Sequence, residues 1–166
     1  MATRIGIISD THGCRDPRFA RYLGECDEIW HAGDIGDPDT LDFFRGIGPT
    51  LRAVSGNIDY GRVRKECPEV LEFTVEECRV LLTHIGGYPG RYSPGIRPML
   101  RDGAVRLFVC GHSHILKVMP DPALGLLHVN PGAAGTRGWH RQRTIVRLTV
   151  DGKNIRDLEV IELART

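Results

Sequence analysis

The chain has 166 residues, so we expect a single domain over residues 1–166 that buries roughly two thirds of its unfolded surface. Its 22 Lys and Arg oppose 21 Asp and Glu, and this scattered charge of +1 does not favour nucleic-acid or anionic-lipid partners. No apolar run approaches the ~20 residues of a membrane span, and a strand that starts by Arg4 leaves no room for a signal peptide. The sequence therefore predicts a cytoplasmic protein without a membrane partner.

The first third of the chain alternates strand and helix patterns. Asp37 and Pro38 are typical of a helix cap and of the first helical turn that follows it. A strand, helix, strand, helix, strand order predicts a parallel sheet with right-handed crossovers. We expect strands at 4–9, 28–31 and 50–55, and helices at 17–23 and 38–47.

The remainder of the chain is rich in strand patterns separated by turn signals. We expect a hairpin at 70–75 and 79–83, a long Gly- and Pro-rich loop at 84–98, a short helix at 96–102, and strands at 105–110, 115–119, 124–129, 143–150 and 154–161. The two halves of the chain are expected to form the two sheets of one layered α/β sandwich, with helices outside.

Seven potential metal ligands occur in five short clusters, each at or just after an expected strand. Open α/β sheets place their sites at the carboxyl ends of strands, so we expect these side chains to meet. Two carboxylates, one amide and four imidazoles are too many for one four-coordinate ion and suit two ions that share a ligand. The residues are Asp10, His12, Asp34, Asn57, His84, His112 and His114.

The spacing of these residues suggests how they act. Asp10 and His12 are two residues apart, as are His112 and His114, and such pairs project to the same side of an extended chain. A carboxylate has two oxygens and a charge that offsets repulsion between cations, which makes Asp34 the natural bridge. Mixed Asp, Asn and His ligation suits Mn, Fe, Ni, Co or Zn, and the sequence does not choose among them.

Each cluster alone has a simpler interpretation, because a lone Asp is more often a cap and a lone His more often a structural group. Five clusters that each lie at or just after an expected strand favour the interpretation as a metal site. The other histidines are expected to act differently. His31 is expected to support a ligand, His128 to line the site or to pack at a strand end, and His140 to be solvated.

These motifs resemble the calcineurin-like metallophosphoesterase family. Its pattern is Asp-x-His, Gly-Asp, Gly-Asn, a single His and Gly-His-x-His, and all of these occur here in that order between residues 5 and 135. The segments Ser9–Gly13, His31–Asp34 and Asn130–Gly132 resemble its small prokaryotic phosphodiesterase subfamily. The resemblance implies a four-layer αββα sandwich.

The resemblance also implies a division of the ligands. Asp34 would bridge two divalent metal ions, one held by Asp10, His12, Asp34 and His114, the other by Asp34, Asn57, His84 and His112. The implied function is a dinuclear-metal phosphodiesterase that hydrolyses small phosphate diesters by in-line attack of a metal-bound hydroxide.

One residue departs from the family pattern. Many relatives have a histidine directly after Gly-Asn, taken as the proton donor to the leaving group, whereas this chain has Ile58. An isoleucine donates no proton, so activated diesters should be favoured over poor leaving groups. Asp59 and His128 are the remaining candidates for a catalytic acid, and Asp59 is also suited to bracing its loop.

Substrate contacts are expected from the loop after His84. Arg91 or Arg97 would pair with a phosphate oxygen, the alternative being a solvated loop. The sequence leaves two functions open: an enzyme acting on a small-molecule phosphate ester, and a non-catalytic interaction module similar to the retromer scaffold subunit. The absence of a basic track disfavours a nuclease. Exposed sheet edges would allow a homodimer.

Overall fold

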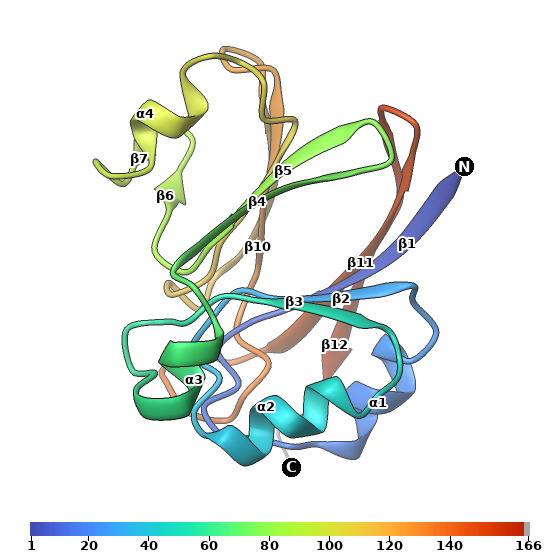
Figure 1. The fold of residues 1–166 in the computed structure, drawn as a ribbon, viewed down its shortest axis with the longest axis vertical. Helices are drawn as coiled ribbons and strands as arrows, with labels where there is room; N and C mark the ends of the chain where they lie inside the picture. Colours follow the sequence, from blue (N-terminus) through green and yellow to red (C-terminus); the bar gives the residue numbers. More distant parts are fainter. Residues whose placement is uncertain (165–166) are drawn as a thin grey trace.

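The computed structural model describes residues 1–164 and contains two five-stranded sheets (Figure 1). In the first sheet the N-terminal strand lies at the centre. The strand order is β12 (Asn154–Leu163), β11 (Arg143–Asp151), β1 (Ala2–Ile8), β2 (Glu28–His31) and β3 (Thr50–Ala53). Strand β1 pairs in parallel with β2, which pairs in parallel with β3, and on its other side β1 pairs in antiparallel with β11.

The second sheet has a parallel centre and antiparallel edges. The strand order is β4 (Val70–Val75), β5 (Cys78–Thr83), β8 (Leu107–Val109), β10 (Leu126–Pro131) and β9 (Leu116–Asp121). Strands β5, β8 and β10 run parallel to one another, while β4 and β9 pair in antiparallel at the two edges.

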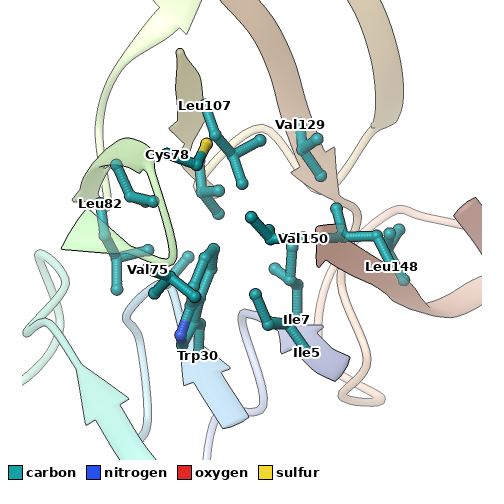
Figure 2. Close-up of a cluster of buried hydrophobic side chains, with 14 of the residues drawn as sticks. Ile5, Ile7, Trp30, Val75, Cys78, Leu82, Leu107, Val129, Leu148 and Val150 are labelled. Atoms are coloured by element: carbon teal, nitrogen blue, oxygen red, sulfur yellow. The ribbon is translucent and has the colours of Figure 1, made fainter. Parts of the chain in front are cut away.

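The main hydrophobic core lies between the inner faces of the two sheets (Figure 2). Ile5 and Ile7 of β1 contribute from the first sheet, and Val80 and Leu82 of β5 contribute from the second. These side chains alternate along their strands because successive residues point to opposite faces of a sheet. Burying each large apolar side chain contributes about 1.5–3 kcal/mol, so this layer holds the sheets together.

The helices cover the outer faces of the sheets (Figure 1). Helices α1 (Pro17–Leu23) and α2 (Pro38–Arg45) pack Phe19 and Phe44 on the first sheet. Asp37 caps α2 by accepting a hydrogen bond from the Thr40 N–H, as expected. The second sheet is covered by the hairpin β6 (Gly87–Tyr88) and β7 (Arg91–Tyr92) together with α4 (Arg97–Leu100).

The fold confirms the expected α/β four-layer sandwich, with three local corrections. Strands β11 and β12 belong to the first sheet, so the two halves of the chain do not correspond to the two sheets. The segment expected as a loop at 84–98 contains a two-stranded hairpin. Helix α3 (Gly61–Glu66) was not expected, because only Val63 of its six residues is buried and no apolar periodicity marks it.

The five cysteines, from Cys14 to Cys110, carry free thiols. Within residues 1–164, no helix is both long enough and apolar enough to span a bilayer.

Candidate metal centre

All seven candidate ligands lie in loops that leave the carboxyl ends of parallel strands. The loop after β1 carries Asp10 and His12, and the loop after β8 carries His112 and His114. The loops after β2, β3 and β5 carry one candidate each, Asp34, Asn57 and His84. The two sheets present these ends on the same side of the molecule, so residues more than one hundred positions apart meet there.

The backbone at these positions is not extended, which corrects the geometry expected from sequence. Asp10, His12 and Asp34 have φ angles of 54°, 46° and 55°, and His112 and His114 have φ angles of 73° and 63°. Left-handed backbone costs a non-glycine residue about 1–2 kcal/mol, and such strain collects at functional sites. Through alternating left-handed residues, Asp10 and His12 reach the same group of candidate ligands, whereas His112 and His114 reach different groups.

The glycines that precede two candidate ligands provide room for other candidate ligands. A Cβ at Gly56 would lie 2.1 Å from Asp34 Oδ1, and a Cβ at Gly111 would lie 2.8 Å from Asp10 Oδ2. Both separations are too short for any side chain. The Gly-Asn and Gly-His pairs of the sequence are therefore packing requirements of this loop edge.

The candidate ligands form two groups of three. Asp10, His12 and His114 offer ligand atoms that all lie within 4.8 Å of one another. Asp34, His84 and His112 do the same. The carboxylates are buried, whereas His112 is exposed, so the site opens to solvent on the His112 side.

Asp34 lies between the two groups. Its Oδ2 is 3.5 Å from His12 Nε2 in the first group and 3.2 Å from His84 Nε2 in the second. Asn57 Oδ1 lies 3.0 Å from both His84 Nε2 and His112 Nδ1, which places the amide with the second group.

Hydrogen bonds outside the two groups orient the ligand atoms. One oxygen of Asp10 accepts from Ser9 Oγ and from the His112 N–H, leaving Oδ1 to face the site. Asp34 Oδ1 accepts a hydrogen bond from the Ile58 N–H, which leaves Oδ2 to face the site. His84 Nδ1 lies 2.7 Å from the Ala32 carbonyl oxygen, which keeps Nε2 directed into the site.

Two further side chains brace the ligand loops. His31 accepts from the Gly33 N–H at Nδ1, and its Nε2 lies 2.9 Å from Thr11 Oγ1, so it connects the loops after β1 and β2 as expected of a supporting residue. Sequence reasoning missed Asn130, which donates to the Gly111 carbonyl and to Ser113 Oγ and holds the last ligand loop. Its place in Asn-Pro-Gly was the available signal.

The carboxylates and imidazoles of the site shift one another's pKa values. Burial raises the pKa of Asp10, but His114, His84 and Ser9 outweigh it and hold the pKa of Asp10 below its usual range. Burial likewise opposes ionisation of Asp34, and its imidazole neighbours again keep its pKa low. The pKa of His84 is raised despite burial, because Asp34 and Asp10 stabilise its charged form.

The donor set fits divalent cations. Asp10 Oδ1 and His12 Nε2 are buried without a hydrogen-bond partner, and both face the other candidate ligands. His114 Nε2 lies 3.2 Å from Asp10 Oδ1 without a hydrogen bond, and a bound cation would satisfy this buried oxygen. Carboxylate, amide and imidazole together suit a first-row divalent ion.

Two cavities flank the second group. The first, about 410 Å³, lies beside Asn57 and His84 and has Arg64 in its wall. The second, about 250 Å³, lies beside His112 and has Lys117 in its wall. Sequence reasoning missed both cations, because Arg64 lies on the unexpected helix α3 and Lys117 reaches the site through the pairing of β9 with β10. Arg91 and Arg97 are exposed and line neither cavity, so their role in substrate binding stays a prediction.

The candidates for a catalytic acid lie in contrasting positions. Asp59 accepts hydrogen bonds from the N–H groups of Ile35, Gly36 and Gly56, a bracing arrangement. His128 is 1 % exposed and lines the second cavity, and burial together with Lys117 lowers its pKa to about 4. A catalytic role for either residue stays a prediction.

His140 differs from expectation. Its ring packs edge-on against that of His114 with centroids 5.1 Å apart, and its Nε2 lies 2.8 Å from the Gly135 carbonyl oxygen. It is therefore part of the wall behind a candidate ligand and is not a fully solvated residue.

Comparison with known proteins agrees with this geometry. Residues 3–153 match the model of the calcineurin-like phosphoesterase superfamily domain. A probable metallophosphoesterase of Methanothermobacter thermautotrophicus is 30 % identical over 95 % of this chain and 91 % of its own length.

Solved structures share the fold. An archaeal phosphodiesterase has a TM-score of 0.76 at 21 % identity, over 96 % of this chain and 99 % of its own. Vps29 of Entamoeba histolytica in complex with Zn²⁺ has a TM-score of 0.66 at 17 % identity, over 96 % and 98 % of the two chains. With its metal-competent loops and its match over residues 3–153, the chain belongs to the calcineurin-like phosphoesterase superfamily.

Proposed function

We propose that the protein is a phosphodiesterase that uses two divalent metal ions to hydrolyse small phosphate diesters. The observation that carries the proposal is the position of Asp34 Oδ2 between His12 of one ligand group and His84 of the other. A carboxylate shared by two groups of ligands is the arrangement that two-metal sites require.

The candidate ligands would be divided between two metal ions. Asp10, His12 and His114 would hold one ion, Asn57, His84 and His112 the other, and Asp34 would contact both. Bound ions would polarise the phosphoryl oxygens and make water acidic enough to lose a proton near neutral pH. The hydrogen bonds to Asp10 and Asp34 orient their free oxygens before metal arrives.

A diester preference is supported by the shape and chemistry around Asn57. Two cavities adjoin the second ligand group, one for each substituent of a diester, whereas a monoester has a single substituent. Ile58 is 39 % exposed beside Asn57 and donates no side-chain proton to a leaving group. Diesters of acidic alcohols, which leave without protonation, are therefore the favoured substrates.

The test is hydrolysis of bis-p-nitrophenyl phosphate and of p-nitrophenyl phosphate by protein stripped of metal. Mn, Ni, Fe, Co or Zn is then added back separately. We expect metal-dependent turnover with the diester faster than the monoester. Absence of turnover with every metal would sink the enzymatic proposal, and faster monoester turnover would overturn the diester assignment.

Variants separate the site from general effects of charge. Asn57→Ala and His112→Ala should each lower turnover by at least about tenfold, since even residues that only support ligands contribute 10–100-fold. Asp39→Asn is the matched control, because the Asp39 side chain is 80 % exposed and takes no part in the ligand groups. If these two site variants kept full activity, the ligand assignment would be wrong.

The non-catalytic module remains the competing function. The likeness to Vps29 shows a shared fold only and transfers no partner to this chain. Metal binding by calorimetry without turnover of either ester would favour the module over the enzyme.

A further inference from the structure

Lys117 is placed beside the candidate metal centre without an acidic partner. It lies on β9 directly opposite Asn130 of β10, the residue that holds the His112 loop. Its Nζ lies over the Tyr88 ring, 4.4 Å from the centroid. Within residues 1–164 no carboxylate oxygen comes within 4.0 Å of this ammonium group. The cation is therefore available to a ligand in the second cavity.

The wall of the same cavity carries a second polar group without a hydrogen-bond partner among the described residues. His128 lies two residues before Asn130 on β10, and its ring packs against those of Tyr92 and Phe108. It is 1 % exposed, lines the cavity, and its Nδ1 has no hydrogen-bond partner among the described residues. Buried polar atoms are normally hydrogen-bonded, so this ring nitrogen is available to a polar group of a ligand that enters the cavity.

The first cavity offers different chemistry. Its cation, Arg64, already donates to Glu69 and to the Gly56 and Asp59 carbonyls. Much of the remaining wall is apolar, with Val70, Ile85, Ile96 and Met99. The two cavities thus differ in charge although they share Ile85 and Ser93 as a common wall.

We propose that the second cavity is a subsite for an ester arm that carries an anionic group, with Lys117 as its specificity-determining residue, while the first cavity takes an apolar or aromatic arm. This assignment rests on the proposed phosphodiesterase function and narrows its substrates to diesters with two unlike arms. Lys117 recognises the charge, and neutral His128 exchanges a hydrogen bond with the arm's polar atoms. The cation–π contact with Tyr88 holds the ammonium at the cavity wall.

The test compares three p-nitrophenyl phosphodiesters whose second arm is carboxyethyl, propyl or choline. All release the same chromophore, so only the retained arm differs. With added Mn²⁺ we expect kcat/KM for the carboxyethyl ester to exceed that of the propyl ester by about tenfold, the typical effect of one charge-assisted hydrogen bond. The choline ester should be the poorest. A wild-type protein that hydrolyses the propyl or choline ester as well as the carboxyethyl ester overturns the subsite.

Variants assign the selectivity to one side chain. Lys117→Met should reduce the ratio of kcat/KM for the carboxyethyl ester to that for the propyl ester to about one, and Lys117→Arg should keep most of the ratio. Lys153→Met is the matched control, since Lys153 is exposed and lines a cavity remote from the ligands. A ratio that survives in Lys117→Met overturns the assignment.

Inhibition gives a readout independent of cleavage of these esters. Carboxyethylphosphonate should inhibit hydrolysis of bis-p-nitrophenyl phosphate more strongly than propylphosphonate, and Lys117→Met should remove that difference. Failure of the proposed function is distinguishable, because then no diester, including bis-p-nitrophenyl phosphate, is hydrolysed by the wild type.

Discussion

The layer between the two sheets and the loop edge that carries the candidate ligands follow opposite physical rules. Between the sheets, apolar side chains such as Ile7, Leu82 and Leu148 are buried on regular strands. At the loop edge, Asp10 and His12 adopt left-handed backbone, and each has a buried polar atom without a partner. The first region stabilises the fold. The second region carries backbone strain and buried polar atoms that a bound ligand would satisfy.

The largest effect should come from Asp34, where the two ligand groups meet. Asp34→Asn keeps the shape of the side chain and tolerates left-handed backbone, but removes the negative charge. We expect kcat/KM for bis-p-nitrophenyl phosphate to fall on the order of 10³-fold, comparable to the loss of a major charge-stabilising group. The metal-free melting temperature should change little. A variant with more than a tenth of wild-type activity would show that Asp34 is not shared.

A core substitution should show the opposite pattern. Leu148→Ala on β11 removes a side chain that is 1 % exposed and should lower the free energy of unfolding by about 3 kcal/mol. Strand β11 carries none of the candidate ligands, so Mn²⁺ affinity of the folded protein should stay within about twofold. Urea unfolding and calorimetry test the two statements. A large loss of metal affinity would mean that core and loop edge are not independent.

Metal should relieve the unsatisfied charge and stabilise the folded protein. At an ion concentration of 100 times Kd, binding contributes about 2.7 kcal/mol, which at this chain length corresponds to roughly 5–10 °C in Tm. Thermal scans of stripped protein with and without Mn²⁺ or Zn²⁺ measure the shift. Asp34→Asn should show a much smaller shift, and an equal shift in both proteins would place the bound ion elsewhere.

The glycine before Asn57 provides a finer test of the loop edge. Gly56→Ala introduces a Cβ against Asp34 Oδ1, so we expect metal affinity to fall by about 10–100-fold. Gly46→Ala is the matched control, because the atoms nearest to its added Cβ are 3.4 Å away or more and its φ is −80°. Calorimetric titration of both variants with Mn²⁺ makes the comparison, and equal affinities would remove the proposed packing role of Gly56.

The smallest effect concerns Asp16, a carboxylate with ordinary partners. Hydrogen bonds from Arg18 lower the pKa of Asp16 to about 2, with a further contribution from Arg143. Because the folded pKa lies below the unfolded value near 3.8, this stability is present above pH 4 and is lost as pH falls toward 2. With solvent screening we expect about 1 kcal/mol. Asp16→Asn should remove that part of the acid dependence in urea unfolding between pH 5 and pH 2.5, and an unchanged slope would contradict it.

Much of the fold could be predicted because its signals are local. Short apolar runs ending at Asp10 or Asp34 mark buried strands, and Asp37 with Pro38 marks a helix start. Sheet membership could not be predicted, because pairing of β1 with β11 joins residues about 145 positions apart. Helix α3 was missed since its one buried side chain, Val63, leaves no periodic pattern.

The sequence by itself determined the fold class and the seven candidate ligands, because strand ends and the residue types that bind metal can both be recognised within a few consecutive residues. The family resemblance also implied how those ligands divide about Asp34, whereas only the tertiary structure decided which side chains meet around them. Asp34 lies between the two groups, and His140 packs on His114, because loops from two different sheets meet there. It also decided which cation faces the site. Lys117 does so because β9 pairs with β10, a contact that no local pattern encodes.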